Sequence, residues 1–156
     1  MAFELKSPAF AEGERIPERH ARDGENLSPP LEWMDPPAAT RSFVILMEDP
    51  DATVGTLRHW GLYHIGRGRT LLPEAVRTDE GAGLEGLGAC VNDFGSLRYE
   101  GPQPPEGDAP HRYIFYVAAL DTERLDGRPG MTVAEMWRAA EPHVLAVAHL
   151  TGSYGR

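Results

Sequence analysis

The sequence predicts a mostly β protein with a short helical segment near its C-terminus. Three observations support this fold class. The 14 prolines and 17 glycines favour turns and long loops, and they argue against a helix bundle. Three short apolar runs have the length and composition of strands. Only the stretch after Thr132 combines a capping signal with the spacing of an amphipathic helix.

The N-terminal part of the chain predicts little regular structure before residue 42. Residues 3–6 are expected to form a short edge strand. Residues 7–41 are expected to be rich in loops, because they are punctuated by Pro8, Pro17, Gly24, Pro29, Pro30, Pro36 and Pro37. The segment Ser42–Glu48 contains the continuous apolar run Phe43–Met47, bounded by charge and proline. It is short for a helix, so we predict a strand buried on both faces.

Two further strands are predicted downstream. They are Trp60–Ile65 and Tyr113–Leu120, and the second is rich in aromatic and β-branched residues. Residues 66–98 contain seven glycines, so we expect long loops around short strands there.

The helical signal lies in the last quarter of the chain. Thr132 and Glu135 form a capping box, followed by an apolar face of Val133, Met136, Trp137 and Ala140. Pro142 removes a hydrogen bond from any regular helix. It predicts either a kink or the first residue of a second helix that runs to about His149. Leu150–Tyr154 is expected to return as a final strand.

Length and charge set limits on the function. A chain of 156 residues suits one domain, spanning residues 1–156. Its net charge of -9 argues against nucleic acid and against electrostatic binding to an anionic membrane. Any anion that it binds must meet a local positive site.

The cysteine count and the hydropathy bear on the compartment. Cys90 is the only cysteine, so no intrachain disulfide can form. The sequence shows neither an apolar run of signal-peptide length nor one approaching the roughly 20 residues of a membrane span. We therefore expect a cytoplasmic protein without stable membrane insertion.

Polar residues at strand ends form the first two candidate clusters. Asp49-Pro50-Asp51 follows the Phe43–Met47 run, where the proline restricts how the two carboxylates are placed. The alternative is an ordinary Asp-Pro turn with solvated acids. His59 precedes the next strand and is either a surface residue or the partner of a carboxylate.

The third cluster is a long loop. Residues 101–107 contain three prolines and two glycines, which restrict the backbone dihedrals, and the loop leads to His111-Arg112-Tyr113. Such a loop can present backbone N–H groups to an anion. The alternative is a rigid connector between strands.

In this order, the clusters resemble the phosphatidylethanolamine-binding proteins, and most closely their bacterial, Raf-kinase-inhibitor-like branch. The resemblance runs from Phe3-Glu-Leu-Lys-Ser-Pro to Gly152-Ser-Tyr-Gly-Arg156. It includes Asp-Pro-Asp-Ala, His-Trp, Asn-Asp-Phe-Gly, Gly-Pro-x-Pro-Pro-x-Gly and His-Arg-Tyr. It implies a sandwich of two packed β-sheets and a small surface cavity for phosphate-like anions or a phospholipid headgroup. Matched by motif, the ligand-binding residues are Asp49, Asp51, Ala52, His59, Gln103, His111 and Tyr113.

Several positions depart from the family pattern. Arg58 replaces an aromatic residue before His-Trp, where it would either strengthen anion binding or point into solvent. Val54 stands near the place of a pocket tyrosine, and His64 replaces an asparagine. Arg22 and Gln103 stand where many bacterial relatives carry cysteines.

Carboxylates beside an anion need a special arrangement, because like charges repel. We expect them to lie behind the ligand, to accept from His59 or His111 and to favour the imidazolium form. The alternatives are a protonated acid, or an acid that faces the ammonium of a zwitterionic headgroup.

The leading hypothesis is non-catalytic binding of a small anionic or phosphorylated ligand, with no metal or cofactor. The alternative is a protein-interaction regulator, similar to a kinase or protease inhibitor, and a homodimer is plausible for the bacterial branch. An enzyme is disfavoured, because the sequence lacks a Gly-x-Ser-x-Gly elbow and a compact HxxH or HExxH metal motif.

Overall fold

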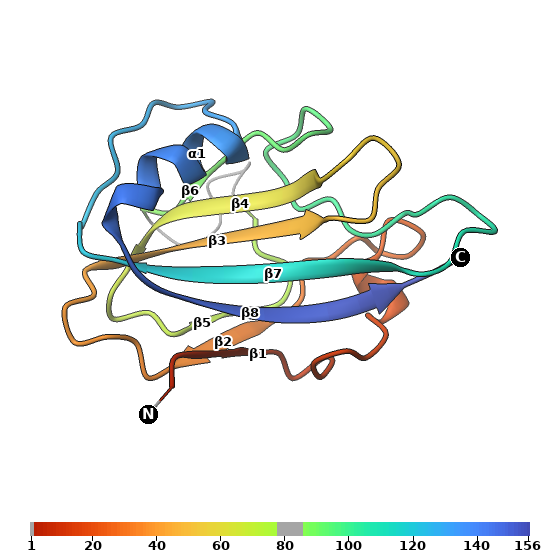
Figure 1. The fold of residues 1–156 in the computed structure, drawn as a ribbon, viewed down its shortest axis with the longest axis horizontal. Helices are drawn as coiled ribbons and strands as arrows, with labels where there is room; N and C mark the ends of the chain where they lie inside the picture. Colours follow the sequence, from red (N-terminus) through yellow and green to blue (C-terminus); the bar gives the residue numbers. More distant parts are fainter. Residues whose placement is uncertain (1, 78–85) are drawn as a thin grey trace.

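Two antiparallel sheets form the body of the molecule (Figure 1). The computed structural model describes residues 2–77 and 86–156. The larger sheet has the order β6-β4-β3-β7-β8, and the smaller has the order β1-β2-β5. The strands are β1 (Glu4–Lys6), β2 (Leu31–Met34), β3 (Ser42–Asp49), β4 (Leu57–Gly66), β5 (Leu71–Leu72), β6 (Gly88–Ala89), β7 (His111–Leu120) and β8 (Val144–Tyr154). The predicted fold class, two packed β-sheets with a short helix near the end, is confirmed.

β3 is the central strand of the larger sheet, and both of its faces are covered. Its residues 42–47 are all buried, as the continuous apolar run predicts. On one side Phe43, Ile45 and Met47 join the core between the two sheets. On the other side Val44 and Leu46 pack beneath the helix α1 (Val133–Ala140). β3 therefore belongs to both hydrophobic clusters.

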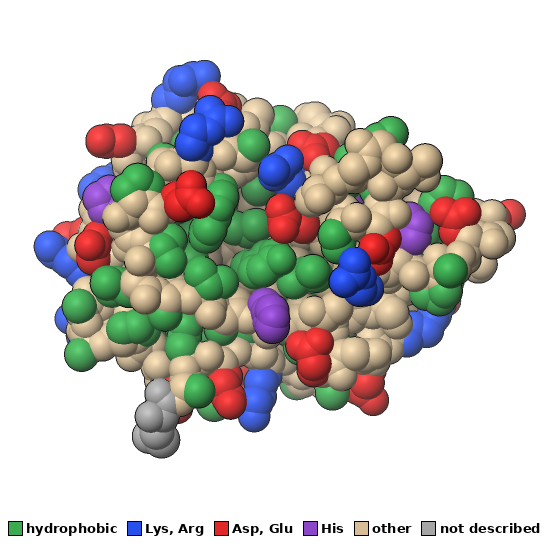
Figure 2. Space-filling model, viewed as in Figure 1, with side chains coloured by type: hydrophobic (Ala, Val, Ile, Leu, Met, Phe, Trp, Pro, Cys, Tyr) green, Lys and Arg blue, Asp and Glu red, His purple; other side chains and the backbone are tan. Residues whose placement is uncertain are grey.

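The helix α1 covers one end of the outer face of the larger sheet. Thr132 accepts from the backbone N–H of Glu135, whose side chain accepts from the Thr132 N–H, so the predicted capping box is present. Val133 and Met136 are buried against β3 and β4. Beside α1, hydrophobic side chains gather in a hollow on this face (Figure 2). Among residues 2–77 and 86–156, no helix has the length and hydrophobicity needed to span a membrane.

Of the two alternatives predicted at Pro142, the second helix running to about His149 is wrong. A 3-10 turn (Glu141–His143) follows α1 directly, and Val144–Tyr154 then forms β8. The alanines at 146 and 148 suit a helix locally, but pairing with β7 along the whole strand overrides this propensity. The expected final strand at Leu150–Tyr154 is the second half of β8.

The loop-rich segment 7–41 contains one strand that was not predicted. β2 alternates buried and half-exposed positions, with Leu31 and Trp33 inside. Prolines flank this four-residue strand. They predicted turns, and the alternation of apolar and polar residues was too short to predict a strand against them. A 3-10 turn (Glu18–His20) lies in the same segment. The short strands β5 and β6 confirm the expectation for 66–98, except at 78–85, which lie outside the described residues.

The capping box allows a direct test of local stability. We expect Thr132→Ala to lower the free energy of unfolding by about 1 kcal/mol, because the N–H of Glu135 loses its acceptor. Urea denaturation measures this change. Thr56→Ala is the matched control, because Thr56 is exposed and makes no hydrogen bond with the described residues. Equal stability of the two variants would contradict the role of the cap.

Candidate functional site

The antiparallel register brings the predicted site residues to one end of the larger sheet. β3 ends at Asp49, while both of its neighbours, β4 and β7, begin at that end. Asp49 pairs with Leu57 of β4, and Glu48 pairs with Ile114 of β7. His59 and His111 therefore both lie beside Asp49, although His111 is 62 residues away from Asp49 along the chain.

A cavity of about 250 Å³ opens at this end of the sheet. Six of the seven predicted site residues line it, and Asp51 does not. Its walls are formed by Arg22, Asp49, Ala52, Thr53, Val54, Leu57, His59, Phe94, Gln103, Pro104, Pro105, His111 and Tyr113. The structure thus brings together residues from β3, β4, β7 and the loops between them.

Asp49 and His111 form a buried pair in the wall of the cavity. The Nδ1 of His111 donates to Asp49 Oδ2 at 2.8 Å, and its Nε2 lies 3.3 Å from Asp108 Oδ2. Burial alone would lower the pKa of His111, but the hydrogen bonds and charges of Asp49 and Asp108 outweigh it and raise the pKa. His111 is therefore the group in this wall that favours the imidazolium form.

His59 differs from His111 in its partners. Its Nδ1 lies 2.7 Å from the backbone oxygen of Glu100, which can only accept, so Nδ1 carries the proton. Its Nε2 is buried and has no partner among the described residues. Burial lowers the pKa of His59, and the hydrogen bond to Glu100 offsets only part of this shift. The neutral ring is favoured, so only His111 fits the expected carboxylate–imidazolium arrangement.

Tyr113 completes this wall of the cavity. Its ring stands edge-on to His59, with a centroid distance of 5.5 Å, and is stacked at 6.4 Å from His111. Burial, together with the nearby Asp49 carboxylate, raises the pKa of the phenol well above its usual range. The hydroxyl therefore stays protonated and donates to the Asp49 carboxylate.

Asp51 faces away from the cavity and joins β3 to β7. Its carboxylate accepts two bonds from the Arg112 guanidinium, at 3.0 and 2.8 Å, and a third from the Arg112 backbone N–H at 2.8 Å. These hydrogen bonds lower the pKa of Asp51 to about 2. The observed contacts of Asp51 hold the turn after β3 in place, and its predicted contact with a ligand stays a prediction.

Among the cavity residues that were not predicted to bind a ligand, Arg22 and Phe94 contribute a charge and a ring contact. Arg22 lies over the Phe94 ring at 5.1 Å and is 3.5 Å from Glu100, so its charge is fixed at the wall. Phe94 in turn packs edge-on against His59 at 4.9 Å. The Asn-Asp-Phe-Gly motif was a signal for Phe94, because the buried Asn92 side chain accepts from the Phe94 N–H and donates to the backbone oxygen of His59.

The proline-rich loop forms the opposite wall. Gln103, Pro104 and Pro105 line the cavity. The start of the loop is fixed at Gly101, whose N–H donates to Asn26 Oδ1 at 2.7 Å. A Cβ at position 101 would lie 2.1 Å from the backbone oxygen of His20, so no larger residue fits there without a shift of the backbone.

The departures from the family pattern have different places in the structure. Arg58 points to the outer face of the sheet, where it lies 3.9 Å from Glu48, and it does not line the cavity. Val54 lines the cavity mouth and is 82% exposed. His64 lies outside the site, where its Nε2 accepts from the backbone N–H of Leu125. Within the described residues, no cluster of three acidic, histidine or cysteine side chains could hold a metal ion.

Comparison with known proteins shows the family of the chain. The model of the phosphatidylethanolamine-binding protein family matches residues 6–155. The chain belongs to this family. A UPF0098 protein of Aquifex aeolicus is 40% identical over 99% of this chain and 89% of its own length. The UPF0098 protein YbhB of Escherichia coli is 37% identical over 97% of this chain and 98% of its own length.

Solved structures share the fold of this chain. YbcL of Escherichia coli has a TM-score of 0.94 at 32% identity, covering 100% of this chain and 99% of its own. A carboxypeptidase Y inhibitor, solved with its cognate proteinase, has a TM-score of 0.57 at 18% identity, covering 98% of this chain and 82% of its own. The second likeness concerns the fold alone.

The Asp51–Arg112 pair predicts a stability difference that depends on pH. Because folding lowers the pKa of Asp51 to about 2, its contribution is present above its ordinary pKa near 4 and is lost as the pH falls towards 2. We expect Arg112→Gln to be less stable than the original chain at neutral pH, and this difference to shrink below about pH 4.

Urea denaturation as a function of pH measures this difference. Arg67→Gln is the control, because Arg67 is exposed and forms no ion pair with the described residues. A destabilisation that stays constant down to about pH 2 would contradict the assignment to Asp51.

Proposed function

We propose that this chain binds a phosphate-like anion in the 250 Å³ cavity and does not itself catalyse a reaction. The anion is inorganic phosphate or the phosphoryl group of a small phosphorylated molecule or headgroup. The observation that carries the proposal is the unpartnered Nε2 of His59, buried in a wall that also contains the His111 imidazole. A buried polar atom without a partner is costly, which favours a missing ligand or water at this point.

Charge and hydrogen-bond donors at the cavity support an anion. Arg22 is positively charged, and His111 favours its charged form. The backbone N–H groups of Ala52 and Thr53 find no acceptor among the described residues. Fixed donors of this kind bind phosphate and sulfate in many proteins. They supply the local positive site that a chain of net charge -9 needs.

The two histidines favour a ligand with a particular protonation state. Neutral His59 presents a lone pair at Nε2, because its proton is on Nδ1. A lone pair accepts from a P–OH group but not from a fully deprotonated oxygen. His111 favours the opposite type of contact, with a charged oxygen. The pair therefore suits a monoanionic phosphoryl group directly, and it suits a fully deprotonated anion such as sulfate with a water that donates to His59 Nε2.

The size and the residue chemistry of the cavity support binding without catalysis. A volume of 250 Å³ lies below the usual range for drug-sized ligands and suits a phosphoryl group with a small substituent. Burial raises the pKa of Cys90 to about 12, so the thiol is a poor nucleophile, and it does not line the cavity. The raised pKa of Tyr113 disfavours a phenolate nucleophile.

Calorimetric titration tests the anion site. Sulfate is the first probe, because its charge is constant near neutral pH, and O-phosphoethanolamine is the second. Below its raised pKa, His111 carries its proton and attracts the anion. Its charge is lost as the pH rises through that pKa, so we expect tighter sulfate binding at about pH 6 than at about pH 8. We expect His111→Gln to weaken binding about tenfold or more.

His143→Gln is the matched control, because His143 forms an exposed pair with Asp121, at 2.9 Å, beyond the opposite end of β7. It should leave sulfate binding unchanged. Absence of heat with both ligands, from folded protein at either pH, would refute the anion site. Hydrolysis of p-nitrophenyl phosphate that is lost in His111→Gln would refute the non-catalytic part of the proposal.

Asp49→Asn tests whether Asp49 acts through His111. Without the carboxylate, the pKa of His111 should fall towards its ordinary value. The pH at which sulfate affinity is half lost should therefore move to lower pH, while binding at the acidic end persists. Sulfate affinity measured by calorimetry across pH gives this midpoint. An unchanged midpoint would show that Asp49 does not set the charge of His111.

A further inference from the structure

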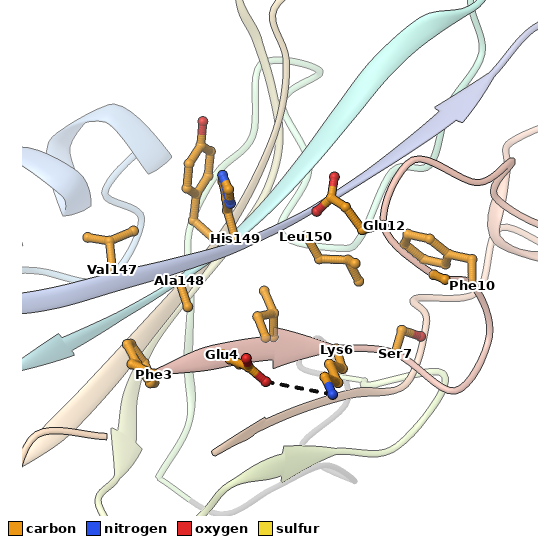
Figure 3. Close-up of a pocket in the computed structure, with 13 residues that line it drawn as sticks. Phe3, Glu4, Lys6, Ser7, Phe10, Glu12, Val147, Ala148, His149 and Leu150 are labelled. Atoms are coloured by element: carbon orange, nitrogen blue, oxygen red, sulfur yellow. Dashed lines mark ion pairs between the residues drawn. The ribbon is translucent and has the colours of Figure 1, made fainter. Parts of the chain in front are cut away.

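A second cavity, unrelated to the anion site, lies between β8 and β1. Its volume is about 640 Å³, more than twice that of the anion cavity. Figure 3 shows Ala148 and Leu150 pointing from β8 into this groove, opposite β1. Phe3 and Phe10 lie at its two ends, and Leu5 is among the residues that line it. The groove therefore has an apolar floor between the edges of the two sheets.

β8 is an edge strand whose outer side is only half covered. The residues after β1 run beside the end of β8. There Gly13 donates to the Thr151 oxygen at 2.7 Å, Ile16 donates to the Ser153 oxygen at 2.8 Å, and Ser153 donates to Glu14. The chain itself thus adds a short segment to this edge, and that segment ends at the level of Thr151.

The other half of the edge is open. In an antiparallel ladder, the N–H and C=O of a residue point to one side, and the side alternates along the strand. The register with β7 is continuous from Tyr154 to Ala146, so Val147 and His149 point outward, as Thr151 and Ser153 do. Among the described residues, none bonds to these outward main-chain groups of Val147 and His149.

This open edge also lacks the charges that usually protect one. Exposed edge strands of monomeric proteins commonly carry lysine or another charge against pairing. β8 contains no Asp, Glu, Lys or Arg, and its Val147 is 46% exposed. Glu4 and Lys6 at the rim pair with each other at 3.6 Å, and Glu12 accepts from the Thr151 N–H.

The chemistry of the groove narrows the choice of occupant. A lipid chain or an apolar small molecule would leave the main-chain groups of Val147 and His149 facing hydrocarbon, which is costly. A second copy of the chain would bring its own charge of -9 against the first. Two chains of this charge repel each other. An extended peptide with bulky apolar side chains satisfies the edge and fills the groove.

We infer that the open half of β8 binds an extended peptide segment of a partner protein, which adds to the larger sheet as a further strand. Alternate apolar side chains of the peptide enter the groove between β8 and β1. The net charge of the chain favours a neutral or basic peptide over an acidic one. This site is independent of the anion cavity, which lies at the far end of β3 and β7 and shares no lining residue with the groove.

The test uses a blocked peptide, acetyl-Lys-Thr-Phe-Thr-Leu-Thr-Phe-Thr-Lys-amide, and amide hydrogen exchange of the full chain. We expect binding with a dissociation constant below about 1 mM. The amides of Val147 and His149 should exchange at least about tenfold more slowly with the peptide bound. A peptide with serine in place of its phenylalanines and leucine should not bind.

Val147→Pro removes one outward N–H that makes no bond within the described residues, and it should abolish binding. Leu71→Lys is the control for surface changes, because Leu71 is 53% exposed on the edge strand β5 of the other sheet. If Val147→Pro does not fold, peptides methylated at alternate backbone nitrogens replace it. One of the two methylation patterns should then abolish binding and the other should not.

Two results would overturn the inference. The first is the absence of binding by the peptide up to about 1 mM, with unchanged exchange at Val147 and His149. The second is a chain that sediments as a dimer and that Val147→Pro converts to a monomer, since the edge would then belong to a second copy.

Discussion

The antiparallel pairing of β3 with both β4 and β7 is the constraint on which the rest of the structure depends. β3 contributes side chains to both hydrophobic clusters, so its register fixes the inner core and the layer beneath α1 together. The same register places its C-terminal residue, Asp49, beside the first residues of β4 and β7. A slip by one residue would reverse the faces of β3 and would separate Asp49 from His111.

Burial and hydrogen bonding give different properties to two chemically identical side chains at the site. His59 donates to a main-chain oxygen and is surrounded by Phe94 and Tyr113, so burial dominates and favours its neutral form. His111 lies between two carboxylates, so their charges dominate and favour its cationic form. The positive character of the cavity is therefore local, and it coexists with a strongly acidic chain.

The sequence was most informative where one local pattern decided the structure. The run Phe43–Met47 and the box at Thr132 and Glu135 predicted a buried strand and a helix start, because burial and capping act over a few residues. Val144–His149 was misread, because its alanines suit a helix and only the distant pairing with β7 makes it a strand. The sequence also did not predict whether a given side chain at the site faces the cavity or points away from it.

Asp51 illustrates this limit at the site itself. The Asp-Pro-Asp motif placed both carboxylates at the end of a strand, but it carried no information on which one faces the cavity. Asp51 points away from the cavity because the guanidinium of Arg112, 61 residues later, donates hydrogen bonds to both of its carboxylate oxygens. The contribution of Arg22 depends in the same way on its distant partners Phe94 and Glu100.

The short segment that runs beside the end of β8 has a consequence for how the chain is made. It links Gly13 to Thr151 and Ile16 to Ser153, so residues near the two ends of the chain complete one sheet edge. Contacts of such sequence separation have a high entropic cost and form slowly. A nascent chain on the ribosome cannot make them until Thr151 and Ser153 have emerged. Apolar side chains of the first segment, such as Phe10, therefore stay uncovered during synthesis until this part of β8 is available.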